Sequence, residues 1–134
     1  MKGKMSQNPV ILFVCEHGAA KSIIAAAHFN RLARDENLNL RAIARGTHPD
    51  ADLSSKTIAG LQEDGLSPTE SIPTKLTSAE IESAQRIVCF CDLPEEYHQK
   101  ATMEQWHGIP PVSEDYERAR DAIVEHLRIL ISQL

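Results

Sequence analysis

The pattern of apolar and polar positions divides the chain into short strands separated by helices and turns. Residues 10–14 form a continuous apolar run, which is typical of a strand covered on both faces of a sheet. Two further strands are predicted at residues 40–45 and 86–90, and a short fourth one at residues 103–106. Apolar residues at helical spacing predict helices in the segments between these strands.

Helices are expected at residues 22–36 and 54–64 and in a long C-terminal segment after Ser113. Gly65 marks the end of the second helix, because glycine is the preferred residue just beyond a helix end. Thr77 and Glu80 form a capping box, which predicts the start of another short helix. We expect Ser113 to cap the last helix, since a serine side chain accepts a hydrogen bond from the first turn.

Strands that alternate with helices predict an α/β fold, with a parallel sheet and helices on both of its faces. The length of 134 residues fits a single three-layer domain, which we assign to residues 9–134. Residues 1–8 are polar and lack the apolar core of a signal peptide, so we expect them to form a flexible tail.

Composition argues against several classes of protein. Apolar residues make up 42% and charged residues 25% of the chain, as in an ordinary globular protein. The net charge of -5 argues against a broad nucleic-acid interface, and no apolar run has the length of a membrane span. Three cysteines form no disulfide framework, which suits the reducing cytoplasm.

The chemistry is concentrated between the first strand and the first helix. The residues there are Cys15-Glu16-His17-Gly18-Ala19-Ala20-Lys21-Ser22. A tight loop at a helix start leaves free backbone N–H groups at the positive end of the helix dipole, where an anion binds. A cysteine at that position loses its proton easily, because the loop favours the thiolate. The alternative is that Cys15 is an inert cysteine at the end of a core strand.

These residues resemble the signature of the low-molecular-weight protein tyrosine phosphatases and of the arsenate reductases that share their fold. That signature is cysteine, five residues, arginine and serine after an apolar strand. The resemblance continues along nearly the whole chain, through Ala44-Arg45-Gly46-Thr47, residues 86–92 and residues 116–123. It implies a four-stranded parallel sheet with helices on both sides.

The resemblance also implies roles for particular residues. Cys15 would be the nucleophile that attacks phosphorus or arsenic, and Ser22 would donate a hydrogen bond to its thiolate. The backbone N–H groups of residues 16–22 would cradle the oxyanion. In the arsenate reductases, a second cysteine at the end of the third strand then forms a disulfide with the nucleophile, and Cys91 matches that position.

The chain departs from the family pattern at several positions. Lys21 replaces an arginine whose rigid fork grips two oxyanion oxygens, whereas an ammonium is a flexible point charge. Pro110 and Pro111 stand where the family has an Asp-Pro pair that supplies the general acid. Glu16, His17 and Gly18 replace a glycine–asparagine pair. The third cysteine of one reductase subclass has no match after Cys91.

Two interpretations remain for the side chains of Glu16 and His17. We expect them to point outward while their N–H groups face the anion. In the alternative, His17 carries a proton in place of the missing aspartate, because imidazole titrates near physiological pH. His48, Asp50 and Asp52 follow the second strand and are candidates for the rim of the site or for an ordinary solvated loop.

Cys89 and Cys91 lie two residues apart at the end of the third strand, and we expect only one of them to face Cys15. We expect Cys91 to be the one that faces Cys15, and the alternative is that both are core residues. Asp92 is either a proton donor or the cap of the turn before Pro94. A zinc site built from Cys15, His17 and Cys91 is disfavoured, because the spacings are unusual and a fourth ligand is missing.

The leading hypothesis from the sequence is a cytoplasmic, oxyanion-handling cysteine enzyme that resembles an arsenate reductase. It would bind no cofactor or metal and would need an external thiol reductant, either thioredoxin or a low-molecular-weight thiol. One alternative is a low-molecular-weight protein tyrosine phosphatase that acts on a phosphorylated substrate. Another is a non-catalytic module that binds phosphate or a similar oxyanion.

Overall fold

The computed structural model describes residues 9–97 and 103–134, and the tail expected at residues 1–8 lies outside them. Strands and helices alternate along the chain, as predicted. In chain order the elements are β1 (Val10–Cys15), α1 (Lys21–Asp35), β2 (Arg41–Gly46), α2 (Ser55–Glu63), α3 (Ser78–Ser83), β3 (Arg86–Cys89), the short 3-10 helix η2 (Glu95–Tyr97), β4 (Met103–Gln105) and α4 (Tyr116–Ser132).

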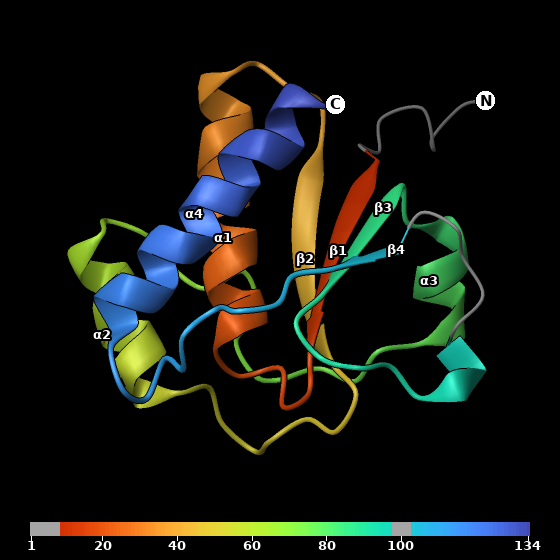
Figure 1. Ribbon diagram of the computed structural model, residues 1–134, viewed down its shortest axis with the longest axis horizontal. Helices are drawn as coiled ribbons and strands as arrows, with labels where there is room; N and C mark the ends of the chain where they lie inside the picture. The colour runs from red at the N-terminus through yellow and green to blue at the C-terminus, as the bar shows by residue number, and fades with distance from the viewer. Residues whose placement is uncertain (1–8, 98–102) are drawn as a thin grey trace.

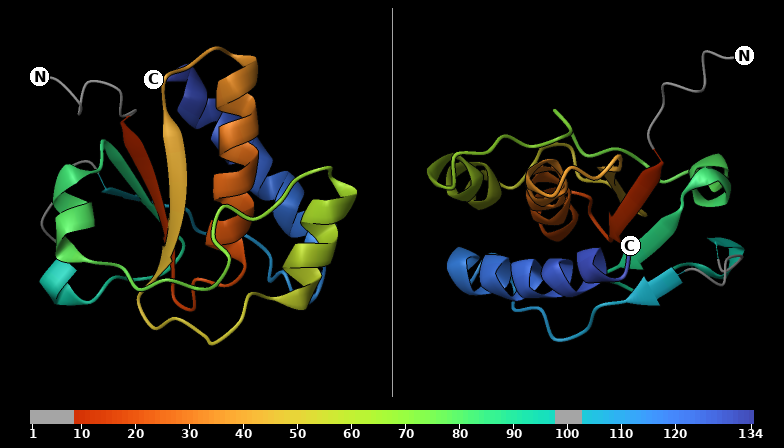
Figure 2. Two further views of the ribbon diagram at one scale, coloured as in Figure 1. Left: turned by 180° about the vertical axis from the view of Figure 1, so that it is seen from behind. Right: turned by 90° about the horizontal axis from the view of Figure 1, so that it is seen from above.

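The four strands form one parallel sheet in the order β2-β1-β3-β4. Helices α1, α2 and α4 lie on one side of the sheet and α3 lies on the other, so the molecule has three layers (Figures 1 and 2). This arrangement confirms the predicted fold class. No helix in the two described ranges is long and apolar enough to cross a membrane.

Strand β1 is central, and its side chains alternate between two apolar clusters. Ile11 and Phe13 pack against α1 and α4, whereas Leu12 and Val14 pack on the side of α3. All four are fully buried. Burial on both faces explains why this strand appears in the sequence as a continuous apolar run and not as an alternating pattern.

The prediction that Ser113 caps the last helix is wrong. Helix α4 begins two residues later than that cap would require, and its N-cap is Asp115, whose carboxylate accepts a hydrogen bond from the N–H of Arg118 at 3.1 Å. Serine and aspartate are almost equally good caps, so their order in the sequence does not show which one is used. Ser113 lies in the turn before the helix and lines the candidate site.

Candidate active site

Hydrogen bonds from a neighbouring segment fix the carbonyl groups of the loop of residues 16–20, which lies between β1 and α1. N–H groups of the segment between β2 and α2 donate hydrogen bonds of 2.7 to 3.2 Å to the carbonyls of Cys15, Glu16, His17 and Ala19. Within the described residues, no N–H group of residues 16–23 donates to another protein group, and no side chain caps α1. The loop therefore keeps a row of N–H groups for an anion.

Two glycines allow this loop to approach the end of β2. Gly18 has a φ of 62°, a conformation that side chains disfavour. A Cβ atom on Gly46 would lie only 2.7 Å from the backbone nitrogen of Gly18. Both positions therefore require glycine, one for its backbone angle and the other for the close contact.

Cys15 ends β1 at the base of this loop and is only 8% exposed. Its Sγ lies 3.0 Å from the Oγ of Ser22, which is fully buried in the first turn of α1. The hydroxyl of Ser22 is therefore in position to donate a hydrogen bond to a Cys15 thiolate. The start of α1 adds its positive dipole end at the same place.

A cavity of about 400 Å³ opens above Cys15, and we name it the Cys15 hollow. Its floor is the loop, and its walls come from three other segments that are distant in sequence. Its lining residues are Cys15, Glu16, His17, Ala19, Ala20, Lys21, Asp50, Ser54, Phe90, Cys91, Pro111, Val112 and Ser113. Two residues of the cysteine motif do not line this hollow: Ser22 contacts Cys15 from the first turn of α1, and Gly18 packs against the end of β2.

Cys91 and Cys89 occupy different environments. Cys91 follows the end of β3, is half-buried and lines the Cys15 hollow, whereas Cys89 is buried in the core below α3. Burial and the nearby charges of Cys15 and Glu16 raise the pKa of Cys91 to about 11. Burial is also the main cause that raises the pKa of Cys89.

His17 is exposed, and it is held at the rim of the hollow by Asp50. Its Nδ1 lies 3.2 Å from the Oδ1 of Asp50, and its carbonyl accepts a hydrogen bond of 3.0 Å from the N–H of Asp50. The Oε1 of Glu16 lies 3.8 Å from the Nε2 atom. The imidazole thus lies between two carboxylates at the rim, whereas Asp52 does not line the Cys15 hollow.

The sequence matches the model of the low molecular weight phosphotyrosine protein phosphatase family over residues 10–120. The chain belongs to this family. No curated protein sequence matches it significantly. Family membership confirms the resemblance that the cysteine loop indicated.

Solved structures of the phosphatase family have the same fold. A low molecular weight protein tyrosine phosphatase from T. tengcongensis is 16% identical, with a TM-score of 0.84 over 94% of this chain and 99% of that one. YwlE of Bacillus subtilis, an arginine phosphatase, is 21% identical, with a TM-score of 0.82 over 93% and 95% of the two chains. An arsenate reductase from Archaeoglobus fulgidus is 25% identical, with a TM-score of 0.76 over 91% and 98%.

The segment before α4 supplies an uncharged wall where the phosphatase resemblance implies an aspartate. Pro111, Val112 and Ser113 line the hollow there. The titratable side chains that do line it are Cys15, Glu16, His17, Lys21, Asp50 and Cys91. All six were candidates from the sequence, and Pro111 was expected at the position of the missing acid, whereas Phe90, Val112 and Ser113 were not assigned to the site because nothing in their residue types indicates such a role.

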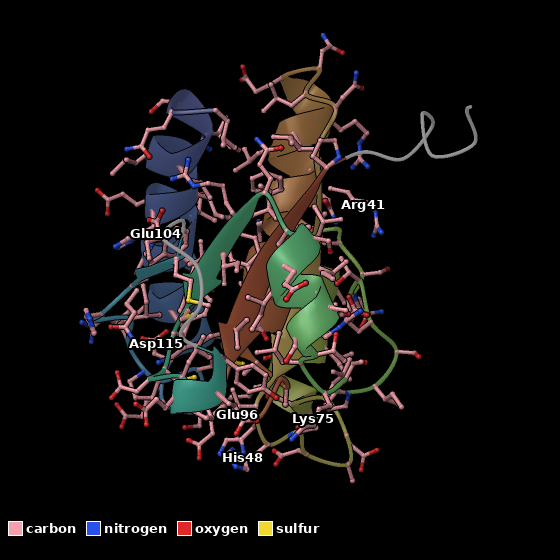
Figure 3. All side chains as sticks on the ribbon, turned by 90° about the vertical axis from the view of Figure 1, so that its right-hand side faces the viewer. Arg41, His48, Lys75, Glu96, Glu104 and Asp115 are labelled. Carbon is pink, nitrogen blue, oxygen red and sulfur yellow. The ribbon has the colours of Figure 1, made fainter. Side chains whose placement is uncertain are left out.

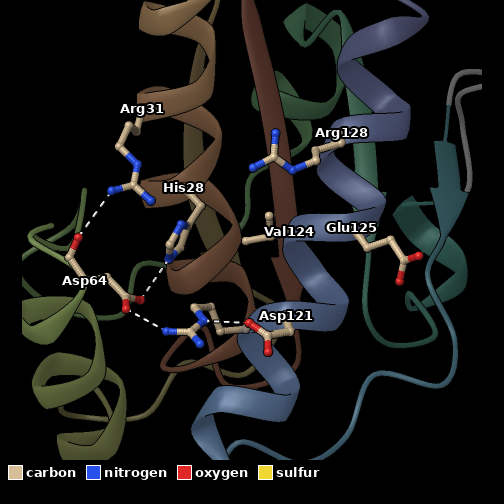
Figure 4. Close-up of a pocket in the computed structure, with 8 residues that line it drawn as sticks. His28, Arg31, Asp64, Asp121, Val124, Glu125 and Arg128 are labelled. Carbon is tan, nitrogen blue, oxygen red and sulfur yellow. Dashed lines mark hydrogen bonds and ion pairs between the residues drawn. The ribbon is translucent and has the colours of Figure 1, made fainter.

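A second buried polar cluster, centred on Asp64, joins three helices away from the loop (Figure 4). The carboxylate of Asp64 accepts hydrogen bonds from Tyr116 at 2.7 Å, Arg120 at 2.7 Å and His28 at 3.1 Å. Burial raises the pKa of Asp64, but these hydrogen bonds and the charge of Arg120 outweigh it and lower the pKa overall. Burial lowers the pKa of His28. The cluster connects α1, α2 and α4 and was not anticipated from the sequence.

The structure does not assemble the zinc site considered from the sequence. Among the described residues, no three or more histidine, cysteine, aspartate or glutamate side chains lie close enough together to hold a metal ion. Cys15, His17 and Cys91 all line the hollow but are not grouped as ligands.

Proposed function

We propose that the protein reduces arsenate or a chemically similar tetrahedral oxyanion, with Cys15 as the nucleophile and Cys91 as the second thiol. The observation that supports this most strongly is that both cysteines line one hollow above a loop of anion-binding N–H groups. It acts in the reducing cytoplasm, where its thiols stay free. Neither a bound cofactor nor a metal is needed for this chemistry.

The oxyanion binds to the N–H groups of residues 16–22, and Lys21 adds a positive charge at the start of α1. An ammonium attracts the anion but does not form the two parallel hydrogen bonds of a guanidinium. Loss of one well-placed donor typically costs about 100- to 1,000-fold in rate. The backbone therefore does most of the binding, and Lys21 supplies mainly charge.

In the first step, the Cys15 thiolate forms a bond to arsenic and one oxygen leaves as water. That oxygen needs a proton, and we assign its donation to His17, which lines the hollow and whose ring lies 3.2 Å from Asp50. The uncharged wall of Pro111, Val112 and Ser113 offers no carboxylic acid for this purpose. Water is also an easier leaving group than an alkoxide or an amine.

In the second step, the Cys91 thiolate attacks the Sγ of Cys15. A Cys15–Cys91 disulfide forms, the arsenic–sulfur electron pair stays on arsenic, and arsenic(V) becomes arsenic(III). The released arsenite takes up protons from the Cys91 thiol and from water. Cys91 has a pKa raised by burial and by the charge of the Cys15 thiolate. Formation of the adduct neutralises the Cys15 sulfur and leaves the negative charge on arsenate oxygens, which the N–H groups of the loop bind.

A second candidate function is a phosphatase, and family membership supports it. Structural neighbours include phosphatases of tyrosine and arginine residues as well as arsenate reductases. The wall formed by Pro111, Val112 and Ser113 contains no aspartate, and this disfavours a phosphatase, because an ester or amide leaving group depends more strongly on a proton donor. A non-catalytic oxyanion-binding module would have the same loop but an unreactive Cys15.

A single-turnover experiment tests the proposal. Reduced protein is mixed with arsenate in the absence of any other thiol, and arsenite is measured. We expect about one arsenite per chain, the stoichiometry of a reduction by two thiols. Cys91→Ser should release none, and Cys89→Ser, the matched control, should behave like the wild-type protein. If wild-type protein releases no arsenite but hydrolyses an aryl phosphate, the protein is a phosphatase; neither activity would favour the binding module.

A further inference from the structure

Cys91 lies in the wall between two cavities. One is the Cys15 hollow, and the other is a hollow of about 410 Å³ that we name the His48 hollow. Its lining residues are Glu16, Thr47, His48, Cys91, Asp92, Leu93 and Pro94. Glu16 and Cys91 line both cavities, whereas Cys15 lines only the first. Figure 3 shows His48 beyond the carboxyl end of β1, at the edge of the sheet where the site lies.

We propose that the His48 hollow is the entry site for a low-molecular-weight thiol, which reduces a Cys15–Cys91 disulfide by attacking the Sγ of Cys91. This inference rests on the proposed reductase function, because it concerns the step that regenerates the two thiols. The chemistry requires two molecules of the external thiol. The first forms a mixed disulfide with Cys91, and the second releases Cys91 as the free thiol together with the oxidised external disulfide.

The direction of attack favours this hollow. A thiolate approaches a disulfide sulfur roughly in line with the bond that breaks, on the side away from the departing sulfur. In a Cys15–Cys91 disulfide, the departing sulfur of Cys15 lies in the first hollow. An attacker of Cys91 must therefore come from elsewhere around Cys91, and the His48 hollow provides open space there.

The choice of sulfur follows from the two leaving groups. Attack on Cys91 expels the Cys15 thiolate, which the hydroxyl of Ser22 and the start of α1 stabilise. Attack on Cys15 would expel the thiolate of Cys91, which burial and the carboxylates of Glu16 and Asp92 disfavour by raising the pKa of Cys91. The better stabilised thiolate leaves faster, so Cys91 is the sulfur that reacts.

The exposure of the two cysteines also favours attack on Cys91. Cys15 is only 8% exposed and lies at the base of the loop, whereas Cys91 is half-buried. A cavity of about 410 Å³ accommodates a small thiol with its carbon chain against Leu93 and Pro94. It is a recess and not an exposed face, so it suits a small thiol better than the active site of a thiol protein.

Charge defines the class of thiol further. Among the described residues, Glu16 and Asp92 line the His48 hollow and no lysine or arginine does, and the ammonium of nearby Lys75 donates to the carbonyl of Thr47 at 3.2 Å. A thiol that carries an ammonium group should therefore react faster than one that carries a carboxylate. His48 also lines this hollow and can accept the proton of the thiol, and its Nδ1 lies 3.2 Å from the Oγ1 of Thr47, which orients the ring.

The test starts from protein oxidised with diamide, so that the disulfide forms without arsenate. Cys89→Ser removes the third cysteine from all samples. The oxidised protein is mixed with cysteamine, 2-mercaptoethanol or 3-mercaptopropionate, which carry positive, zero and negative charge. Quenched samples are mapped by mass spectrometry. We expect the mixed disulfide on Cys91. When each rate is divided by the rate of the same thiol with a small neutral disulfide, which removes differences in thiol acidity, the value for cysteamine should be about tenfold above that for 3-mercaptopropionate at low salt.

Asp92→Asn should reduce the difference between the two charged thiols, whereas the control Asp52→Asn, in a residue that lines neither hollow, should leave it unchanged. A mixed disulfide on Cys15, equal rates for the three thiols, or turnover only with thioredoxin would overturn the inference. Failure of diamide to link Cys15 and Cys91 would do the same. If diamide forms the disulfide but arsenate does not, the proposed function is refuted, and the experiment with the three thiols can still be interpreted.

Discussion

Lys21 is the residue whose identity most affects how the loop works. It is the first residue of α1 and lines the Cys15 hollow, at the position where the family resemblance implies arginine. A lysine side chain supplies a mobile charge without the fixed fork of a guanidinium, so the anion must be oriented by backbone N–H groups. This explains why the loop is held so firmly from outside through its carbonyls.

At the residue scale, His17 and Asp50 yield a prediction. His17→Gln should lower the single-turnover rate with arsenate by roughly 100-fold near pH 6, the low end of the usual contribution of a general acid. It should also change the dependence of the rate on pH, because the variant lacks the group that donates the proton. Stopped-flow measurement of arsenite release over a range of pH provides both observations.

Asp50→Asn separates the role of Asp50 from that of His17. The variant keeps the imidazole but removes its carboxylate partner at 3.2 Å. We expect a smaller loss of rate than for His17→Gln, because the imidazole is kept and only the group that orients it is lost. Asp52→Asn is the control in the same segment. An unchanged pH–rate profile in His17→Gln would show that another group supplies the proton.

Single residues differ in how far the sequence reveals them. The spacing of Cys15 and Ser22 places them at the two ends of a loop, and their side chains meet at 3.0 Å because the helix begins immediately. The partner of His17 could not be predicted, because Asp50, Asp52 and His48 follow the same strand and nothing in the sequence ranks them. Only the path of the segment between β2 and α2 brings Asp50 to His17.

At the scale of elements, α1 connects the site to the rest of the structure. Its first turn carries Ser22, and two turns later the buried His28 donates to Asp64 just beyond α2. Tyr116 and Arg120 of α4 bind the same carboxylate. Gly60 of α2 leaves room for the ring of Tyr116, which a Cβ atom there would meet at 2.4 Å. The start of α1 is therefore fixed by packing that lies outside the loop.

The cluster around Asp64 predicts a pH-dependent stability. His28→Gln should lower the free energy of unfolding at pH 8 by about 1–3 kcal/mol, because it removes a buried hydrogen bond to a carboxylate. Burial lowers the pKa of His28 from 6.5 in the folded state, so its stabilising contribution is complete above pH 6.5 and is lost at lower pH. The difference between wild type and variant should therefore narrow as the pH falls from 8 to 5.

Urea unfolding at several pH values measures this difference. His107→Gln changes an exposed histidine and is the matched control, for which we expect little change at any pH. If the difference in the free energy of unfolding between wild type and His28→Gln stays constant or widens as the pH falls, the assigned role of His28 is contradicted.

Most elements could be predicted because their patterns are strong. The central strand β1 is apolar at every position from 10 to 14, and Thr77 and Glu80 form both hydrogen bonds of the predicted capping box. The start of α4 could not be predicted, since Ser113 and Asp115 are both good caps. Asp115 is the cap because of the irregular path of the backbone after Pro111, and that path depends on tertiary packing.

At the scale of the whole molecule, the site exists because parallel strands end at one edge of the sheet. The carboxyl ends of β1 and β3 bring Cys15 and Cys91 to one hollow, although 75 residues separate them in sequence. The alternation of strands and helices was enough to predict this convergence. The walls of the two hollows were not predictable, because they consist of loop residues placed by the fold.

The central claim is that Cys15 and Cys91 act together on an oxyanion. The most direct measurement is peptide mapping by mass spectrometry of reduced protein after addition of arsenate, with an untreated sample as control. We expect a Cys15–Cys91 disulfide that forms only with arsenate and at the same rate as arsenite release. A protein that keeps all its thiols free, or that links Cys89 to either partner, would contradict it.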